Sequence, residues 1–436
     1  MPKRWLIRPH DAESIRNLER DARIPAVVAQ LLVARGVRDA AAVRRFLGGT
    51  LRDLRDPEML PGLSEAADRI VAAVRAGRRI VVYGDYDADG MCATAILMRC
   101  LTAIHAEASW YVPNRFDEGY GLNVTALEGL AAAGAGLVVT VDCGIASVSE
   151  SLAARALGIE LIITDHHAFG DSLPEAAAVV HPRLPGTDYP FGELCGAGVA
   201  FKLAWAIATR ISGDRQVTPR LREMLLGGIG LAALGTVADV VPLIDENRIF
   251  VQHGLAALKE RGGTGVWKLM ELAGLHDKSS LDSEDVAFRL APRLNAAGRF
   301  GQATCGIELL TTGDDARAID LATSVHELNS QREHEERSIQ LSASKQATER
   351  YDPSADAALV LADRGWHPGV IGIVAGRLAE KWHRPVVMIA RGSHEGLPAT
   401  GSVRSVPGFD VHAALSACRE LLCSCGGHAA AAGLRI

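Results

Sequence analysis

The residues best suited to chemistry follow three short apolar runs in the first half of the chain. The runs are RIVVYG at 79–84, LVVTV at 137–141 and LIIT at 161–164. If these runs are parallel strands, their carboxyl ends open into one crevice at the edge of a sheet. The acids and histidines that follow them are then expected to meet, together with a further acid in LGTVADVVPL: Asp85, Asp87, Asp89, Asp142, Asp165, His166, His167 and Asp239.

Carboxylates combined with imidazole are typical ligands of Mn²⁺ or Mg²⁺, and Mn²⁺ accepts histidine more readily. Two such ions, about 3.5 to 4 Å apart, can hold the attacking and leaving oxygens of a phosphoryl transfer. A carboxylate that bridges the ions is the usual support. Asp142 stands alone at the tip of its run and is our candidate for the bridge. The pattern therefore predicts a two-metal centre for phosphoryl transfer.

Each part of this pattern also has a structural explanation. The DxDxDG sequence at 85–90 resembles the start of a calcium loop, but the glutamate that such a loop needs is missing. Asp165 alone can cap a helix, and adjacent histidines can be satisfied by hydrogen bonds. The coincidence of these groups at three successive strand ends favours the metal centre. The run GAGVAF at 196–201 lacks the third glycine of a dinucleotide fingerprint, so it predicts helix packing.

The segments around these residues alternate between short strands and longer helices. Amphipathic stretches such as MCATAILMRCLTAI at 91–104 and VTALEGLAAAG at 124–134 separate the apolar runs. This repetition predicts an α/β fold with a doubly wound parallel sheet.

A second, smaller α/β domain is expected after residue 350. It has apolar runs at 358–362 and 385–389, with a helical stretch between them. The segment 314–350 contains neither Gly nor Pro and is highly charged, which predicts a long connecting helix. We therefore predict four parts: a helical Arg-rich segment at 1–50, a catalytic domain at 51–270, connecting helices at 271–350 and a substrate-binding domain at 351–436.

Length and composition indicate the number of domains, the state of the cysteines and the location of the protein. A chain of 436 residues predicts two or three domains. Its eight cysteines lack the spacing of a disulfide framework or a zinc site, which favours reduced thiols. Neither a signal peptide nor a run of ~18 apolar residues is found, so a cytoplasmic protein away from membranes is expected. Residues 1–56 carry 12 Lys/Arg against 7 Asp/Glu, although the whole chain has a net charge of -6.

Four motifs, GDYDADG, DCG, DHH and GTVADVVPL, resemble in type and order those of the DHH phosphoesterase family. Five further segments narrow the resemblance to RecJ-like exonucleases with a DHHA1 domain, and it covers the chain from about residue 40 onward. These segments are VPNRFDEGYGLN at 112–123, PRLNAAGR at 292–299, HPGVIGIVAGRL at 367–378, GSVRS at 401–405 and GGHAAAAG at 426–433. The resemblance implies a two-metal exonuclease that degrades single-stranded DNA from 5′ to 3′ into mononucleotides, in recombination and repair.

The resemblance also implies roles for individual residues of the centre. The metal ligands are expected to be Asp87, Asp89, Asp142, His166 and Asp239, with Asp85 as a further candidate. The catalytic residues are expected to be Asp142, Asp165, His166 and His167. His167 is expected to face the scissile phosphate. Some family members have a histidine two residues before the first Asp of this loop, where this chain has Tyr83, so the number of ligands on one metal stays open.

In the second domain, two glycines before His428 allow backbone amides to approach a phosphate, and Arg404 offers a bidentate donor. The resemblance implies that these groups hold the terminal phosphate of the strand. The expected substrate-binding residues are Arg115, Asn295, Arg299, Ser402, Arg404, Gly427 and His428. For Arg299 and Arg377 the alternative is an interdomain salt bridge. Tyr120 and Phe116 can stack on bases, although Phe116 fits the core better.

Relatives of this kind continue past the GGH motif into a single-strand-binding OB-fold, whereas this chain ends at Ile436. It is expected to be either a truncated chain or a shortened relative. Two other functions stay open: a DHH phosphoesterase for short oligoribonucleotides or nucleotide by-products, and a non-catalytic single-strand-binding relative. The expected partner is single-stranded DNA, with a single-strand-binding protein and a recombination helicase as further candidates.

Overall fold

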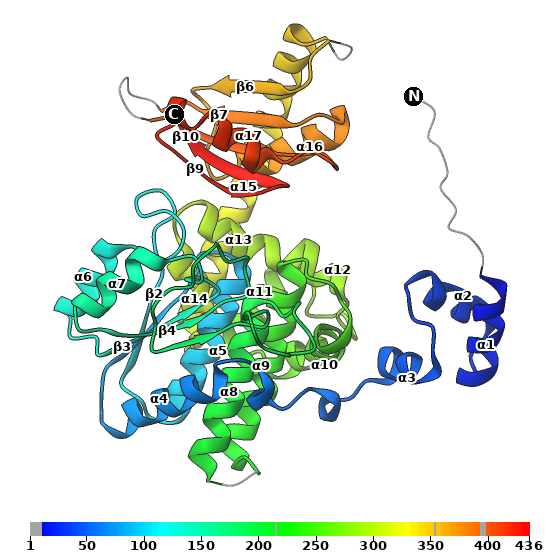
Figure 1. Cartoon of the computed structure of the whole chain (residues 1–436), viewed down its shortest axis with the longest axis vertical. Coiled ribbons are helices and arrows are strands. Elements are labelled where there is room, and N and C mark those ends of the chain that lie inside the picture. Colours follow the sequence, from blue (N-terminus) through cyan, green and yellow to red (C-terminus); the bar gives the residue numbers. More distant parts are fainter. Residues whose placement is uncertain (1–10, 214–215, 353–354, 393–397) are drawn as a thin grey trace. The chain divides into compact units, whose positions relative to one another are not determined.

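The apolar runs that precede the acidic residues are strands of one sheet in the computed structural model (Figure 1). The structure describes residues 11–213, 216–352, 355–392 and 398–436. The sheet has the order β2-β1-β3-β4-β5, and all neighbours in it are parallel. This confirms the predicted parallel sheet. Its strands are β1 (Ile80–Tyr83), β2 (Ala108–Tyr111), β3 (Leu137–Val141), β4 (Glu160–Thr164) and β5 (Ala178–Val180).

The strand order reverses between β1 and β3. From β1 the chain crosses to β2 on one side and then returns to β3 on the other side. β1 and β3 are buried along their whole length, as the continuous apolar runs predicted. A reversal of this kind leaves a crevice beyond the carboxyl ends of the two central strands. Asp85 and Asp142 follow these two strands.

Four helices form the helical core next to this sheet: α5 (Ala88–Ala103), α8 (Gly196–Ser212), α9 (Pro219–Ala238) and α10 (Asp245–Arg261). Within the described residues, α9 is the one helix long and apolar enough to cross a membrane. However, 72% of that window is buried inside the protein. Its apolar composition is therefore that of a core helix packed against α5, α8 and α10.

The first 323 residues also contain other helices. Helices α1 to α3 have a small apolar cluster of their own around Leu18, Leu32 and Val43. The bounds are α1 (Ala12–Ala22), α2 (Ala26–Ala34), α3 (Ala40–Gly48), α4 (Leu63–Arg75), α6 (Val124–Ala132), α7 (Val148–Ala156), α11 (Thr264–Leu272), α12 (Ser283–Asp285), α13 (Ala291–Arg299) and α14 (Ala303–Thr311). Short 3-10 turns cover Leu51–Asp53 and Pro57–Met59, and Val286–Leu290 is a turn of π-helix.

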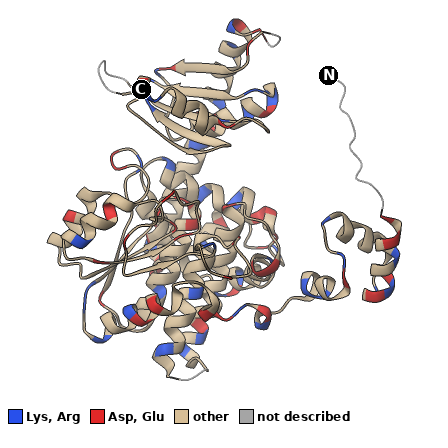
Figure 2. Cartoon of the chain, viewed as in Figure 1, with Lys and Arg blue, Asp and Glu red and all other residues tan. Residues whose placement is uncertain are grey.

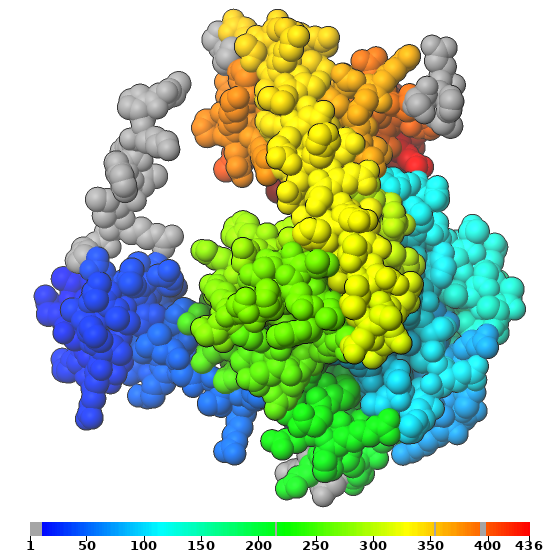
Figure 3. Space-filling view, turned by 180° about the vertical axis from the view of Figure 1, so that it is seen from behind, coloured from blue at the N-terminus to red at the C-terminus, as the bar shows by residue number. Residues whose placement is uncertain are grey.

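The charged segment predicted as a connecting helix is helix α15 (Asp315–Arg350), shown in yellow in Figure 3. It has 36 residues and no helix-breaking Gly or Pro. The chain divides within this helix into two compact units, Met1–Thr323 and Ser324–Ile436. Figure 2 shows Lys and Arg interspersed with Asp and Glu on the helices of both units.

The second unit contains a mixed sheet of order β6-β7-β8-β10-β9, in which β6 and β7 are parallel and the other pairs antiparallel. Helix α16 packs on β7 and β8, and α17 packs on β9 and β10. This is the smaller α/β domain that the sequence predicted. The bounds are β6 (Leu359–Asp363), α16 (Ile371–Trp382), β7 (Val386–Ala390), β8 (Thr400–Arg404), α17 (Val411–Ala417), a 3-10 turn (Arg419–Leu421), β9 (Ser424–His428) and β10 (Ala431–Arg435).

Candidate metal centre

The acidic loop after β1 turns directly into helix α5. Asp87 is the N-cap of this helix, and its Oδ1 accepts a hydrogen bond of 2.9 Å from the amide of Gly90. The amide of Ala88 donates to Oδ1 of Asn295 at 2.9 Å. Asn295 was predicted to contact substrate, and the structure shows it holding this loop. The two contacts fix the backbone that carries Asp85, Asp87 and Asp89.

Asp89 is held by the start of helix α8. Its two oxygens accept hydrogen bonds from the amides of Gly196 (2.7 Å) and Ala197 (2.9 Å), and its side chain is 1% exposed. The run GAGVAF therefore begins a helix, as predicted, and also orients an acid. Sequence reasoning missed this second role. A Cβ at Gly196 would lie 2.6 Å from Cγ of Asp142, so this helix can approach the acids because position 196 is glycine.

Asp142 follows β3 in a left-handed backbone conformation, with φ of 62°. This conformation is uncommon for a residue other than glycine and persists where the surroundings impose it. The hydroxyl of Tyr120 donates to the backbone oxygen of Asp142 at 3.2 Å. The carboxylate is 1% exposed, and its Oδ1 lies 3.0 Å from Nε2 of His166. The strained turn thus aims the Asp142 carboxylate towards the histidines that follow β4.

Asp165 organises the DHH segment. Its Oδ2 accepts from the amide of Ile145 at 2.9 Å, and its Oδ1 accepts from the amides of His166 (2.7 Å) and His167 (3.1 Å). The same Oδ1 lies 2.8 Å from Nδ1 of His167. An ionised carboxylate only accepts hydrogen bonds, so Nδ1 of His167 carries the proton and Nε2 is left for another partner. Asp165 therefore positions the two histidines.

His166 points its Nε2 towards three carboxylates. This atom lies 3.0 Å from Asp142, 3.7 Å from Asp239 and 3.8 Å from Asp89. Asp239, the further acid predicted from LGTVADVVPL, is the C-cap of α9 and therefore reaches the centre from a helix end. The backbone oxygen of His166 accepts a hydrogen bond from the guanidinium of Arg183 at 2.7 Å, which holds the loop that follows β4.

The donor atoms at these strand ends form three groups of a size that can hold a metal ion. The atoms within each group lie within 4.8 Å of one another. Asp142 belongs to two of the groups. The groups are Asp85 with Asp87 and Asp142, Asp142 with His166 and His167, and Asp89 with His166 and Asp239.

Three buried atoms of this cluster have no hydrogen-bond partner among the described residues: Oδ1 of Asp85, Oδ1 of Asp142 and Nε2 of His166. Buried polar atoms are nearly always paired, so unpaired atoms of this kind need a cause. A bound cation satisfies carboxylate oxygens and an imidazole nitrogen together. The residues present therefore fit Mn²⁺ or Mg²⁺.

The clustered charges shift the pKa values of the acids upwards. Burial and the repulsion of Asp89 and Asp87 raise the pKa of Asp239 to about 8, and they raise the pKa of Asp142 well above its usual value. Burial, followed by the charge of Asp87, raises the pKa of Asp89 to about 6. A nearby cation reverses such shifts because it favours the ionised carboxylates.

The histidines and Asp165 respond differently. Burial and the neighbouring His167 lower the pKa of His166 to about 3, so its ring is neutral. Burial alone would lower the pKa of His167, but the hydrogen bond to Asp165 and the charge of Asp165 raise it to about 9. Burial would raise the pKa of Asp165, but the hydrogen bond and charge of His167 lower it to about 2. The pair is thus a carboxylate and an imidazolium.

Two predicted substrate-binding residues of the first unit, Arg115 and Arg299, lie on different segments of the chain. The guanidinium of Arg115 lies 5.0 Å from the ring centre of Tyr86, within the acidic loop. Arg299 is the last residue of α13, the helix that also carries Asn295. Tyr120, which was considered for base stacking, is half exposed, and its hydroxyl also lies 3.2 Å from Nδ1 of His167.

In the second unit, the predicted phosphate-binding residues lie on adjacent strands. Arg404 of β8 pairs with Ala431 of β10, which pairs with His428 of β9. Cross-strand partners point to the same face of a sheet, so Arg404 and His428 share a face. Nη1 of Arg404 donates to Oγ of Ser402 at 3.0 Å. Gly427 has a φ of 141° and lies against the backbone of Ala432.

Arg377 pairs with Glu336 of helix α15, and both residues belong to the second unit. This ion pair therefore lies within one unit.

Comparisons with known proteins agree with this arrangement. Residues 79–229 match the DHH family, N-terminal domain, and residues 355–436 match the DHHA1 domain. The single-stranded-DNA-specific exonuclease RecJ of Salmonella typhimurium is 37% identical over 450 aligned residues, which cover 100% of this chain and 76% of that protein. The chain belongs to the RecJ family. RecJ of Bacillus subtilis is 40% identical over 99% of this chain.

A solved member of the RecJ family has the same fold. The crystal structure of RecJ in complex with Mn²⁺ from Thermus thermophilus has a TM-score of 0.82 and 36% identity over 97% of this chain. The chain spans 53% of the length of the Bacillus subtilis RecJ and 58% of the Thermus thermophilus RecJ chain.

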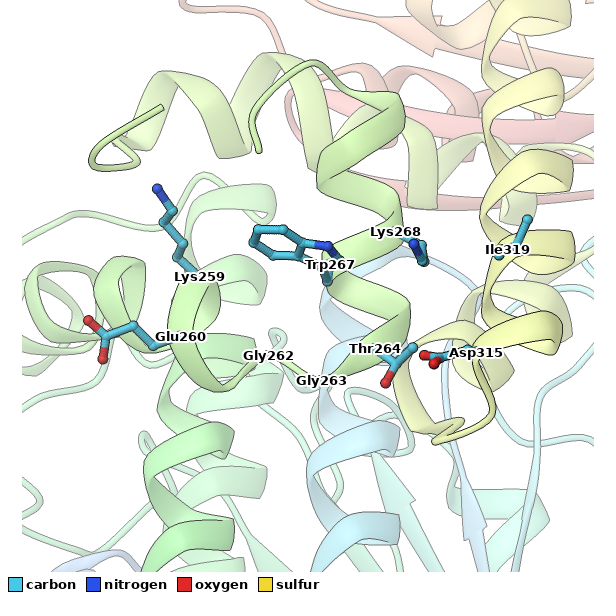
Figure 4. Close-up of a pocket in the computed structure, with 9 residues that line it drawn as sticks. All are labelled: Lys259, Glu260, Gly262, Gly263, Thr264, Trp267, Lys268, Asp315 and Ile319. Atoms are coloured by element: carbon cyan, nitrogen blue, oxygen red, sulfur yellow. The ribbon is translucent and has the colours of Figure 1, made fainter. Parts of the chain in front are cut away.

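A pocket of about 580 Å³ lies between α10, α11 and the start of α15, away from the candidate metal centre (Figure 4). It is lined by Lys259, Glu260, Gly262, Gly263, Thr264, Trp267, Lys268, Asp315 and Ile319. None of the predicted metal, catalytic or substrate-binding residues lines it. The candidate centre is instead a packed group of side chains at the sheet edge.

Proposed function

We propose that the chain is a metal-dependent phosphodiesterase that degrades single-stranded DNA from its 5′ end to mononucleotides. One observation supports this best. Unpaired carboxylate and imidazole atoms meet at the strand-order reversal of a chain that belongs to the RecJ family. Relatives with this name are single-stranded-DNA-specific exonucleases. Recombination and repair are the processes that we propose for it.

Two cations, Mn²⁺ or Mg²⁺, are the proposed cofactors. One would be held by Asp85, Asp87 and Asp142, and the other by Asp89, His166 and Asp239. When bound, such ions lower the pKa of water and neutralise the charge that develops on the phosphate. Asp142 is the proposed bridge because it also lies 3.0 Å from His166 of the second group.

His167 is the residue that we propose to contact the scissile phosphate. Its Nδ1 is engaged by Asp165, and the raised pKa keeps a proton on its Nε2. An imidazolium with its Nδ1–H bonded to Asp165 has one donor left to offer to a non-bridging phosphate oxygen. Asp165 and Tyr120 hold the ring in this orientation.

The second unit supplies the proposed site for the 5′ phosphate. Arg404, Ser402, Gly427 and His428 provide a guanidinium, a hydroxyl, a backbone amide and an imidazole on the strands β8 and β9. A terminal phosphate accepts hydrogen bonds from all of these groups. Arg115 and Arg299 are the proposed contacts to the rest of the strand.

We also propose that the protein acts in the cytoplasm, where its eight free cysteines would stay reduced. A single-strand-binding protein and a recombination helicase are proposed partners.

The test is degradation of one oligonucleotide labelled at either its 5′ or its 3′ end, with Mn²⁺ present. We expect the 5′ label to be released as a mononucleotide first, and a duplex of the same sequence to resist. The Asp142→Ala variant should lose more than about 100-fold of the rate, because misplaced reacting groups cost about this much. Early release of the 3′ label, preferred cleavage of a dinucleotide, or an active Asp142→Ala enzyme would contradict the proposal.

A further inference from the structure

A buried ion pair joins two of the elements that carry the candidate metal ligands. Lys202 of α8 and Glu246 of α10 both have side chains that are 0% exposed, and Nζ lies 2.6 Å from Oε1. We propose that this pair is a positioning device that holds Asp239 against Asp89 and His166. The inference rests on the proposed metal-dependent function. Neither Lys202 nor Glu246 forms a hydrogen bond or ion pair with these three residues. The pair acts instead through the backbone of the two helices that it joins, α8 and α10.

On the α8 side, the helix carries both Lys202 and the anchors of Asp89. The amides of Gly196 and Ala197 at its start hold the two oxygens of Asp89. A shift of α8 along its axis would therefore move the Asp89 carboxylate. The Lys202 side chain fixes this helix to the chain around residue 55, because Nζ also donates to the backbone oxygen of Arg55 at 2.8 Å.

On the α10 side, a short connection joins the end of α9 to the start of α10. Asp239 stands at the beginning of this connection, and Glu246 lies in the first turn of α10. Val240 and Asp245 both have left-handed backbones, with φ of 60° and 49°. Residues other than glycine keep such conformations only where their surroundings impose them. The connection is therefore held in place by its contacts.

Those contacts are made by Asn247, which follows Glu246, and by Arg55, which binds both members of the buried pair. Nδ2 of Asn247 donates to the backbone oxygens of Glu193 (2.5 Å) and Pro242 (3.1 Å), the second of which lies inside the connection. Arg55 pairs with Asp245, and its amide donates to Oε1 of Glu246 at 3.0 Å.

The second oxygen of Glu246 also has a partner, because it accepts a hydrogen bond from the hydroxyl of Tyr189. Glu246 thus links α10 to α8, to residue 55 and to the segment around residue 189.

Stability alone does not account for this arrangement. Replacing a buried ion pair by apolar side chains of similar volume is frequently neutral for folding, whereas removing one partner is strongly destabilising. An apolar pair would fill the same space, but it would lose the hydrogen bonds to Arg55 and Tyr189. Those bonds fix where α10 begins, and therefore where the connection from Asp239 must end.

The two halves of the centre are held by different parts of the chain. The group of Asp89, His166 and Asp239 depends on the connection between α9 and α10, whereas the carboxylates of Asp85, Asp87 and Asp142 follow β1 and β3. Loss of the pair should therefore weaken one cation position more than the other.

The experiment measures Mn²⁺ binding by titration calorimetry, and the melting temperature without metal, in the full chain. The variants are Lys202→Met, Glu246→Leu and the two combined. The control is Arg317→Gln with Glu308→Gln, which removes an exposed ion pair elsewhere in the first unit. We expect each single variant to melt at a lower temperature and the combined variant to recover.

In all three variants, one of the two Mn²⁺ binding steps should weaken by about 10- to 100-fold, as is typical when the support of a ligand is removed. The other step and the control should stay as in the unmodified chain. A combined variant that binds both ions normally would overturn the proposal and show that the pair is structural. Equal weakening of both steps would also overturn it. If the unmodified chain binds no Mn²⁺, the proposed function itself fails.

Discussion

His166 and His167 are neighbours in the sequence, yet their side chains meet different partners. Nε2 of His166 faces Asp142, Asp89 and Asp239, whereas Nδ1 of His167 is bonded to Asp165. We therefore propose that the first histidine is a metal ligand and that the second is a cationic donor beside the centre.

This difference predicts different effects for the two alanine substitutions. His166→Ala should lower both bound Mn²⁺ and turnover, because it removes a ligand. His167→Ala should lower turnover by about 100-fold or more, which is the usual effect of losing a positioned proton donor. Its Mn²⁺ binding should stay close to normal. The metal content of each variant after desalting and its single-turnover rate show whether the two histidines have these different roles. Equal loss of metal in both variants would show that the roles are wrongly assigned.

The raised pKa values predict how stability depends on pH in the metal-free protein. The pKa of Asp239 is about 8 against a usual 3.8, and that of His167 is about 9 against a usual 6.5. Both groups bind a proton more tightly in the folded than in the unfolded chain, so stability is lost as pH rises. His166 has a pKa of about 3 in the folded chain and 6.5 in the unfolded chain, so its opposite contribution is nearly complete by about pH 7.5.

In EDTA, the melting temperature should therefore fall as pH rises from about 7.5 to 9. With Mn²⁺ it should rise over the same range, because deprotonated ligands bind the metal better. The Asp239→Asn variant should have a shallower slope in EDTA. A melting temperature in EDTA that rises with pH would contradict the description of the site as a strained cluster of acids.

At the scale of the elements, the close approach of α8 to β3 depends on a single glycine. A Cβ at position 196 would lie 2.6 Å from both Cβ and Cγ of Asp142. Gly196→Ala should therefore push the helix away from the Asp142 and Asp89 carboxylates. We expect weaker Mn²⁺ binding and a loss of activity, together with a lower melting temperature.

The matched control is Gly129→Ala in helix α6, where a new Cβ meets nothing within 4 Å. This substitution should raise stability by about 0.5 to 1 kcal/mol, the usual preference of a helix for alanine over glycine. Thermal unfolding and Mn²⁺ titration of both variants provide the comparison. Normal metal binding by Gly196→Ala would show that α8 does not position the acids.

The elements of the first unit were largely predictable because buried parallel strands have a distinctive composition. The runs at 79–84, 137–141 and 161–164 are strands, and residues 314–350 contain the predicted helix. The convergence of the acids could be predicted because parallel strands have their carboxyl ends at the same edge of a sheet. These features depend on local composition and on general rules of sheet topology, both of which can be read from a sequence.

Other features could not be predicted because they depend on contacts between distant segments. Nothing in GAGVAF shows that its first amides would hold Asp89, and nothing in PRLNAAGR shows that Asn295 would accept from Ala88. Lys202 and Glu246 are ordinary charged residues of two helices until the fold buries them together. The two glycines at the start of GAGVAF indicate only that some other group lies close to this helix, without showing which one.

At the scale of the whole molecule, the two units supply different parts of the proposed reaction. The first unit holds the cluster of acids, and the second carries Arg404 on β8. Arg404→Ala should weaken binding of oligonucleotides with a 5′ phosphate more than those with a 5′ hydroxyl. The lost charge-assisted contact contributes about 1.5 to 3 kcal/mol, so the preference for the phosphate should shrink by about tenfold or more.

Binding of the two oligonucleotides to Arg404→Ala at several salt concentrations tests this assignment. If Arg404 instead contacts the internal backbone, both substrates should weaken together and the salt dependence should fall by about one phosphate contact. An unchanged preference for the 5′ phosphate would leave Arg115 as the next candidate.

The acids and histidines at the strand ends are proposed to form a two-metal centre. The most direct measurement is anomalous X-ray diffraction at the manganese absorption edge, on crystals of the full chain grown with Mn²⁺. Two peaks are predicted, one beside Asp85, Asp87 and Asp142 and the other beside Asp89, His166 and Asp239. The contrary result would be a map that shows manganese peaks elsewhere in the crystal but none at these residues. It would contradict a two-metal centre at the strand ends.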